Sequence, residues 1–497
     1  MATTAVTAAL ILLAGCGGDD KKSDSGSENN GGTSTSSPTP SAPAFPTFDP
    51  PMAFTASAAY PVPDWEGRAM FDEAMPGMVG QVALVANYRG VTGRDVVDPS
   101  TAWEVKSTAA DTTTVNDASK PMAVKVDGKD VAVMAYAEAD KGNGTQKPQG
   151  LVLVQWIDVA TGQKLAEVST PVSTVDGSFG NPELKNVQYD PETGQVAIGV
   201  SASDRLIVKT RFATVYADPT TKKSTVVPGV LPGAVHGGVL AGAKAESKEN
   251  ANDAGVVLVD GASGKVTKQI PLKQGDVEPL TGGAKHAFFY GTLYSRNTMK
   301  DVGSLYSVDL STGTVVKSVP GLPEGGGYDC TWDHASSIVC RDSAPSGQHE
   351  IFGLDDSTGK KTWGWTTESG ERVVPRVTAA YHGVVYVQTE KQAVLMDAKT
   401  GEDLPGASPS GTPSGSPSAD ETPSSSDSPS DGNSSTASGT PSDQKSAGGS
   451  DMSLYDGKLG SPGAVSPYGG VYTQLPQGSG FGSSDLRAVL VYLKPSA

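Results

Sequence analysis

The sequence predicts an all-β fold, a β-propeller of seven blades closed by N- and C-terminal strands, with eight blades as the alternative. A turn of the form Asp-x-x-Thr-Gly recurs, and 60, 42, 49, 46 and 42 residues separate the successive leading aspartates. Such a period is typical of a four-stranded propeller blade. The 60 glycines among 497 residues, and an aromatic content of 6%, suit many tight turns between short strands.

Each copy of the turn follows a hydrophobic run, and residues 353–365 hold the fullest one. The Asp carboxylate can accept backbone N–H groups two residues on, and Gly supplies the positive φ that closes a short hairpin. We therefore place each copy between the third and fourth strands of a blade. The expected turn residues are Asp158 and Gly162, Asp260 and Gly264, Asp309 and Gly313, Asp355 and Gly359, and Asp397 and Gly401, with a copy lacking Gly at Asp218.

The first 15 residues are predicted to be an export signal. Residues 5–14 form an apolar run too short to span a bilayer. The run ends in Leu13-Ala14-Gly15-Cys16, which resembles the lipobox of bacterial lipoproteins. The resemblance implies that Cys16 is diacylated, becomes the new N-terminus and holds the protein at the outer face of the cell membrane. The alternative is a free Cys after a fortuitous apolar run.

Residues 16–63 follow as a predicted flexible tether. They are rich in Ser, Thr, Gly, Pro and Asp and show almost no apolar periodicity. Such a composition cannot bury enough apolar surface to order itself.

The propeller is expected within residues 64–404. Counting back from each turn gives six internal blades, at 121–170, 184–228, 233–272, 278–321, 327–366 and 373–404. Apolar runs without alternation are expected there, because neighbouring blades cover both faces of each sheet.

Strand-like pieces remain at both ends of the chain. Residues 81–86 precede a degenerate turn led by Asp98, and residues 470–475 and 487–493 form two more strands. One blade shared between the two ends gives seven blades and removes exposed edges, whereas separate blades give eight.

A second segment of biased composition interrupts the propeller. Residues 405–451 are nearly all Ser, Pro, Gly, Thr and Asp, so we expect a disordered insertion, either an unmodified spacer or a carrier of O-linked sugars. Residues 452–497 then supply the closing strands.

Two cysteines remain after the signal. Cys330 and Cys340 flank a predicted hairpin turn at 333–337, so the two thiols would face each other on paired strands. An exported protein favours a disulfide there, with two buried free thiols as the alternative.

Four histidines share one position in the repeat, because 50, 48 and 48 residues separate His236, His286, His334 and His382. Each precedes a blade's second strand, on the rim that also carries the Asp-x-x-Thr-Gly turns. A metal or anion site is one interpretation. We favour tight-turn residues, since equivalent residues of adjacent blades lie too far apart to share one ion. We likewise assign the turn aspartates to capping rather than to calcium, and expect no metal.

The formal charge of −17 argues against a nucleic-acid partner, whose phosphates would be repelled. It indicates an acidic, soluble surface.

The repeated pattern consists of a strand, the turn Asp-x-x-Thr-Gly-Lys and a second strand that contains Trp, and it is best formed at residues 354–363. This pattern resembles the pyrroloquinoline-quinone-type repeat. That repeat occurs in quinoprotein alcohol dehydrogenases and in non-enzymatic lipoproteins that scaffold cell-envelope assemblies. The dehydrogenases have eight blades, a disulfide between adjacent cysteines and a calcium ion. The tether and insertion look similar to those of surface lipoproteins of high-GC Gram-positive bacteria.

Two functions stay open. We expect a non-catalytic binding or scaffold module for an envelope protein, peptide or glycan, without a cofactor, because no two cysteines are neighbours here. The alternative is a quinone- or metal-dependent oxidoreductase, since the repeat specifies the blade and not the activity.

Overall fold

The fold was analysed in a computed structural model of the chain. It describes residues 45–62, 74–107, 113–142, 145, 148–174, 177–178, 182–203, 210–244, 252–297, 299–318, 327–342, 349–369, 372–404, 450–474 and 488–496. The chain divides into the units Met1–Ala44 and Phe45–Ala497. The predicted signal, Cys16 and most of the predicted tether and insertion lie outside the described residues.

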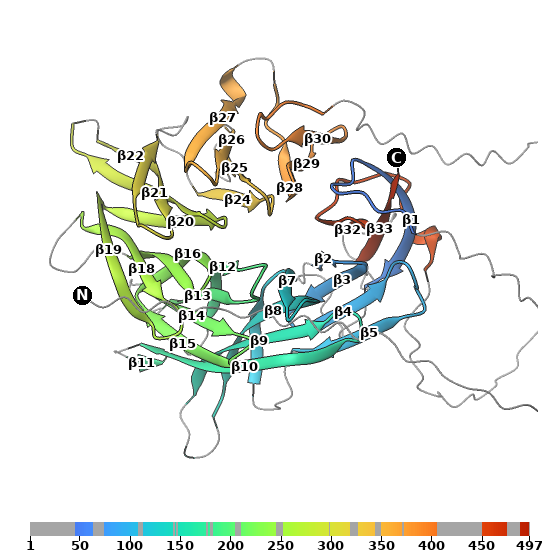
Figure 1. Cartoon of the computed structure of the whole chain (residues 1–497), viewed down its shortest axis with the longest axis horizontal. Coiled ribbons are helices and arrows are strands. Elements are labelled where there is room, and N and C mark those ends of the chain that lie inside the picture. The colour runs from blue at the N-terminus through green and yellow to red at the C-terminus, as the bar shows by residue number, and fades with distance from the viewer. Residues whose placement is uncertain are drawn as a thin grey trace, which may run out of the picture. The chain divides into compact units, whose positions relative to one another are not determined.

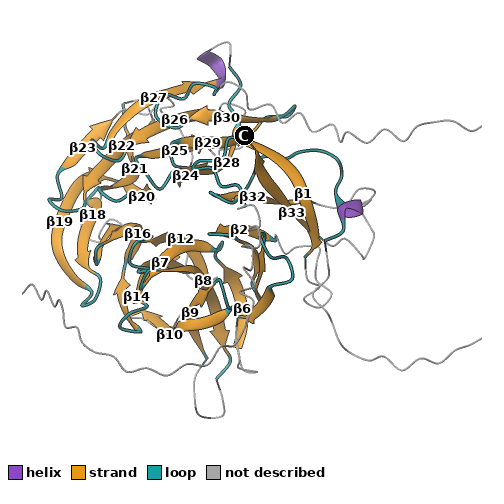
Figure 2. Cartoon of the chain, turned by 45° about the vertical axis from the view of Figure 1, so that its right-hand side comes forward, coloured by secondary structure: helices purple, strands orange, loops and turns teal. Residues whose placement is uncertain are grey.

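Residues from Phe45 onward form a β-propeller of eight sheets, here called blades 1 to 8 in chain order (Figure 1). The innermost strands lie around a common centre (Figure 2). The all-β propeller prediction is confirmed, but seven blades was wrong and the alternative of eight is correct.

Blades 1 to 4 follow the chain from Met75. Blade 1 contains β2 (Met75–Val79), β3 (Val82–Asn87), β4 (Gly90–Asp95) and β5 (Ala102–Lys106). Blade 2 contains β6 (Thr113–Ala118), β7 (Met122–Val126), β8 (Lys129–Asp140), β9 (Gln149–Asp158), β10 (Gln163–Thr174) and β11 (Gly177–Ser178). Blade 3 contains β12 (Glu183–Tyr189), β13 (Val196–Ser203), β14 (Thr210–Asp218) and β15 (Lys223–Pro228). Blade 4 contains β16 (Val230–His236), β17 (Val239–Lys244), β18 (Ala254–Asp260) and β19 (Lys265–Gln274).

Blades 5 to 8 complete the ring. Blade 5 contains β20 (Asp276–Gly282), β21 (His286–Ser295), β22 (Lys300–Asp309) and β23 (Val315–Ser318). Blade 6 contains β24 (Tyr328–Trp332), β25 (Ser337–Asp342), β26 (Glu350–Asp355) and β27 (Lys360–Thr366), followed by the 3-10 helix η1 (Thr367–Ser369). Blade 7 contains β28 (Arg376–Tyr381), β29 (Val384–Gln388) and β30 (Ala393–Asp397). Blade 8 contains β1 (Ala53–Pro61), β31 (Ala464–Ser466), β32 (Gly469–Gln474) and β33 (Val489–Ser496), with the 3-10 helix η2 (Met452–Leu454) preceding β31.

There are eight blades because residues 75–106 form a complete blade of their own, while the C-terminal strands form another that the N-terminal strand β1 completes. The N-terminal pieces at 81–86 and 95–105 gain an innermost strand, β2, and so complete blade 1. That strand contains Pro76 and Gly77, both weak strand formers, which hid it from sequence reasoning. Gly77 is needed for packing, because a Cβ there would lie 2.7 Å from Cβ of Pro121, directly before β7 of blade 2.

The predicted tether, residues 16–63, includes a strand that belongs to the propeller. Its last residues form β1, which pairs with β33 as the outer strand of blade 8. Ala58, Ala59 and Tyr60 are buried there. Four of the nine residues of β1 are Ala, a weak strand former, so its order comes from tertiary pairing rather than from a strong local signal.

Apolar side chains fill the space between every two adjacent blades. Separate buried clusters join blades 1 and 2, 2 and 3, 3 and 4, 4 and 5, 5 and 6, 6 and 7, 7 and 8, and 8 and 1. In β18, every residue before Asp260 is buried, as expected for a sheet covered on both faces. The clusters between successive blades therefore close the ring.

The ring has two different rims. What we call the turn rim carries the connections from first to second and from third to fourth strands, as the pairing of His286 with Asp309 shows. The opposite rim, called the loop rim, is where the second strands end and the third strands begin, as at the described connections 88–89 and 389–392. Among the described residues, no helix is both long and apolar enough to cross a membrane.

Candidate functional site

The Asp-x-x-Thr-Gly copies all lie on the turn rim. In the fullest copy, the amide of Thr358 donates to Oδ1 of Asp355 (2.8 Å) and Gly359 donates to the Asp355 carbonyl (2.8 Å). The φ of Gly359 is +67°, and Lys222 takes a φ of +54° in the copy that lacks Gly. The carboxylates at positions 158, 218, 260, 309 and 397 accept backbone N–H groups in the same way.

Hydrogen bonding holds the pKa of Asp309 at about 2, chiefly through the Ser311 hydroxyl. These carboxylates are therefore engaged by their own turns. Among the described residues, no group of three or more His, Cys, Asp or Glu side chains is placed to hold a metal ion.

The four repeated histidines also lie on the turn rim. His236 ends the first strand of blade 4, His286 begins the second strand of blade 5, and His334 and His382 lie in the connections between first and second strands. His334 and His382 have positive φ angles of 59° and 43°, and Gly237 follows His236 with a φ of +55°. The structure thus places them in or directly beside the first-to-second turns of four separate blades.

Three aspartates that the sequence reasoning did not single out join neighbouring blades at this rim. Asp190 of blade 3 accepts the Gly237 amide of blade 4 (2.8 Å). Asp356 of blade 6 accepts the His286 amide of blade 5 (2.9 Å). Asp333 of blade 6 accepts the Gly383 amide of blade 7 (3.1 Å). An acidic residue close to a rim turn is the signal that could have found them.

An aromatic cluster spans the turn-rim end of the axis. The Tyr189 hydroxyl of blade 3 lies 3.3 Å from Nε2 of His334 in blade 6. The His334 ring also packs near Trp332 (5.0 Å) and Tyr381 (6.5 Å), and Tyr381 stacks on His382 (3.9 Å). Burial lowers the pKa of His334 to about 4, with His382 adding to the effect and Asp333 opposing it. His334 is therefore neutral at physiological pH.

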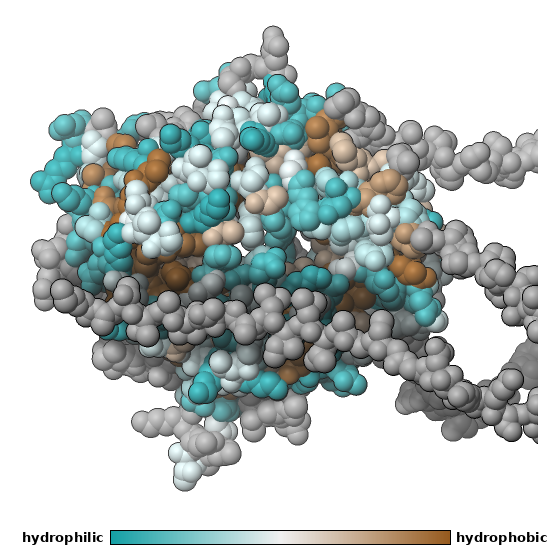
Figure 3. All heavy atoms as spheres, viewed as in Figure 1, coloured by the Kyte–Doolittle hydropathy of each residue, from teal (hydrophilic) through white to brown (hydrophobic). Residues whose placement is uncertain are grey.

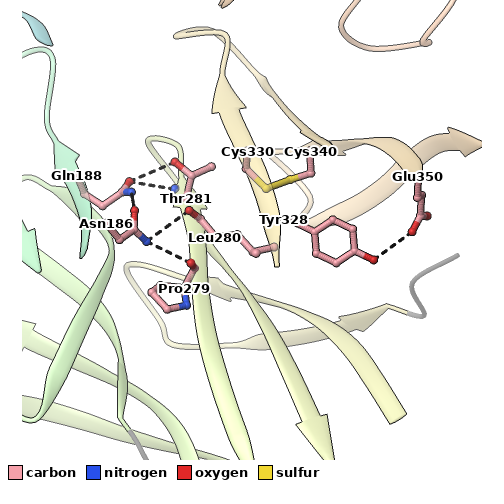
Figure 4. The surroundings of a disulfide bond; sticks show 10 residues. Asn186, Gln188, Pro279, Leu280, Thr281, Tyr328, Cys330, Cys340 and Glu350 are labelled. Atoms are coloured by element: carbon pink, nitrogen blue, oxygen red, sulfur yellow. Dashed lines mark hydrogen bonds between the residues drawn. A yellow bond between two sulfur atoms is a disulfide. The ribbon is translucent and has the colours of Figure 1, made fainter. Parts of the chain in front are cut away.

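Two amide side chains of β12 reach β20 of blade 5, past the innermost strand of the blade between them (Figure 4). Asn186 Nδ2 donates to the Pro279 carbonyl (3.2 Å), and Gln188 Oε1 accepts the Thr281 hydroxyl (3.3 Å). With the Tyr189 contact, these bonds tie blades 3, 5 and 6 together near the axis.

Cys330 and Cys340 pair directly across β24 and β25 and form a disulfide with their Cα atoms 4.0 Å apart. Figure 4 shows this bond near Tyr328, whose hydroxyl donates to Oε2 of Glu350 (3.2 Å). Cys340 is fully buried. The bond therefore staples the two inner strands of blade 6, and Cys330 has no adjacent cysteine in the sequence.

On the loop rim, the β21–β22 hairpin exposes large apolar side chains. Its strands are ten residues each and end in a tip where Tyr294, Met299 and Val302 are 51%, 71% and 45% exposed. The Tyr294 hydroxyl donates to Sδ of Met299 (3.4 Å), which orders the tip. The face of the molecule drawn in Figure 3 is mostly hydrophilic, with small separate hydrophobic areas. Three large apolar residues on one tip therefore stand out.

The sequence matches no protein-family model and no curated protein. Among solved structures, it is similar to a prolyl endopeptidase (12% identity, TM-score 0.37, covering 71% of this chain and 48% of that one). It is also similar to the β-propeller domain of the Trilobed protease from Pyrococcus furiosus (13%, 0.35, covering 60% and 84%). A third is the dihydro-heme d1 dehydrogenase NirN in complex with DHE (15%, 0.41, covering 73% and 75%).

This chain spans about half the length of the prolyl endopeptidase that it matches. The similar structures are propellers of mixed function, and with scores this low they carry no functional argument.

Proposed function

We propose that the protein is an extracytoplasmic lipoprotein whose propeller acts as a non-catalytic binding module for a protein or peptide of the cell envelope. The sequence Leu13-Ala14-Gly15-Cys16, followed by a Ser- and Pro-rich segment, supports a lipid anchor on Cys16. The anchor would keep the propeller at the outer face of the membrane.

The difference between the two rims is the observation that carries the proposal. On the turn rim, aspartates and histidines are used by their own turns or by the next blade. On the loop rim, the connections differ in length from blade to blade, and the β21–β22 tip exposes three large apolar side chains. Non-repeating loops on a rigid scaffold are where binding residues concentrate.

The chemistry of the tip fits a protein partner. Burying Tyr294, Met299 and Val302 would each contribute roughly 1–3 kcal/mol if the partner excluded water. Arg296 and Lys300 flank them, although the chain as a whole carries a formal charge of −17. An apolar groove with an acidic border would complement this tip.

The rival function is that of a quinone- or metal-dependent oxidoreductase. Eight blades match the number in quinoprotein dehydrogenases, but a blade count specifies the ring and not its chemistry. The residues present do not fit the cofactor of that resemblance. The disulfide joins residues on opposite strands rather than sequence neighbours, and the Asn186, Gln188 and Tyr189 contacts cross part of the axial region. We therefore derive no redox step.

A comparison of purified variants as bait tests the binding function. The triple variant Tyr294→Ser, Met299→Ser, Val302→Thr is immobilised beside the wild-type fragment 45–497 and exposed to solubilised envelope. We expect one or more partners to bind wild type and to lose at least about tenfold in affinity for the variant, the equivalent of 1.4 kcal/mol.

The matched control is Met452→Ser with Val266→Thr, which removes similarly exposed apolar residues elsewhere (42% and 39%). Equal binding by the triple variant and wild type would show that the β21–β22 tip is not the binding site. Quinone-loaded protein that reduces an artificial electron acceptor would instead establish the oxidoreductase.

A further inference from the structure

The chain enters the propeller at the turn rim. The Phe48 amide donates to the carbonyl of Pro467, in the turn between β31 and β32 (2.9 Å). The next residue, Asp49, pairs through Oδ1 with Nδ1 of His382, in the turn between β28 and β29. Both turns link the first and second strands of their blades, so both belong to the turn rim.

Further contacts fix this entry segment, residues 45–51, between blades 7 and 8. The Phe45 ring lies 6.1 Å from the Tyr468 ring, and Nζ of Lys494 lies 5.2 Å from the Phe45 ring centre. The Tyr386 hydroxyl, buried between the blades, donates to the Pro51 carbonyl (2.7 Å). The position of Phe45 on the rim is therefore set by packing and hydrogen bonds together.

We infer that the turn rim faces the membrane and that the loop rim, with its β21–β22 tip, faces away toward the partner. The inference rests on the proposed lipid anchor at Cys16 and on the tether that composition predicts between Cys16 and Phe45. Such a tether of about 28 residues has a root-mean-square span of roughly 30 Å.

The dimensions of the propeller, together with the position of Phe45, indicate which rim faces the membrane. A strand of eight residues is about 26 Å long, and four strands extend about 19 Å outward from the innermost one. To place the loop rim against the bilayer, the tether would have to pass outside a blade and along its height, about 45 Å in all. That exceeds its mean span, whereas the opposite orientation requires no stretching.

Energy transfer on vesicles tests the orientation with the full chain, lipidated in a bacterial host. A donor dye is attached at Ala262→Cys, in an exposed turn of the turn rim, or at Met299→Cys on the loop rim. Cys330 and Cys340 are disulfide-bonded, and Cys16 would carry the lipid, so the introduced thiol is the reactive one. The vesicles contain phosphatidylcholine with an acceptor-labelled lipid.

We expect transfer from the Ala262→Cys dye to exceed that from the Met299→Cys dye by about twofold, given a height difference of roughly 26 Å. Equal or reversed transfer from vesicle-bound protein would overturn the orientation while leaving the anchor intact. Flotation with the vesicles measures the anchor separately, with Cys16→Ala as the unanchored control. Wild-type protein that fails to float would overturn the anchor, and the orientation with it.

Discussion

Individual carboxyl groups on the rim act mainly by satisfying backbone amides. Oδ1 of Asp333 accepts the amides of Ala335, Ser336 and Ser337 at 2.8–2.9 Å, while Oδ2 accepts Gly383 of the next blade. Asp260, in contrast, is exposed and bonds within its own turn, chiefly to Ser263. The contribution of an Asp to the stability of the fold therefore depends on how deeply its carboxylate is buried.

Replacing Asp333 with Ala should lower the free energy of unfolding by about 3 kcal/mol, because buried amides lose their acceptor. Asp260→Ala should cost much less, since water can replace the carboxylate there. Urea unfolding of both variants measures the difference. Equal losses would show that burial does not separate the two roles.

Glu138 makes stability depend on pH. It is 3% exposed on β8, and burial, with the charge of Glu167 adding to it, raises its pKa to about 7. An unfolded Glu has a pKa of about 4.3, so the folded state binds the proton more tightly. The unfolding free energy of wild type should therefore fall as the pH rises from about 4 to 7.

Glu138→Gln should remove this dependence and be more stable than wild type at pH 8 by on the order of 3 kcal/mol. The advantage should shrink as the pH falls toward 4. Denaturation at a series of pH values measures it, with the exposed Glu183→Gln as the control for loss of one charge. A constant difference across the series would contradict the prediction.

At the scale of elements, a turn glycine can adopt a positive φ and can also leave room for the neighbouring blade. Two Gly→Ala substitutions separate these two roles. All five predicted turn glycines have positive φ, between 64° and 74°. A Cβ at Gly359 would also lie 2.3 Å from Oγ of Ser307 in blade 5. Gly128 has a φ of +76° with no heavy atom within 4 Å of its Cβ position.

Gly128→Ala should therefore cost about 1 kcal/mol, for the left-handed backbone alone. Gly359→Ala should cost about 3 kcal/mol, because overpacking against blade 5 adds to the backbone term. Chemical denaturation of the two variants compares them directly. A smaller loss at Gly359 than at Gly128 would mean that the contact between blades 5 and 6 relaxes freely.

For the whole molecule, ring closure depends on a strand that lies far from its partners in the sequence. β1 pairs with β33 along its length and covers Val489, Val491 and Leu493. A protein that begins at residue 64 lacks this strand. It leaves the edge of β33 open, with its apolar residues uncovered.

We expect the fragment 64–497 to melt about 5–10 °C below the fragment 45–497, because part of the closing blade is lost. Thermal unfolding followed by circular dichroism measures the difference, and limited proteolysis should cut the shorter fragment first near its C-terminus. Identical melting temperatures would show that β1 is dispensable for closure.

The sequence alone determined the class of fold, because each blade needs the same tight turn and that turn has a local chemical signature. Asp355 and Gly359 are recognisable from the five-residue turn that they begin and end, whatever surrounds it. The histidine positions followed from the same period. The pairing of Cys330 with Cys340 followed from a hairpin, which is also local.

Only the tertiary structure decided the blade number, the closing strand and the contacts across the axis. β1 and β2 both have weak local signals. β1 becomes a strand by pairing with β33, which is remote in the chain, whereas β2 pairs with the adjacent β3 and packs against β31 of blade 8. Asp333, Asp356 and Tyr189 matter because the ring brings neighbouring and distant blades together. Such contacts depend on closure, which no local pattern encodes.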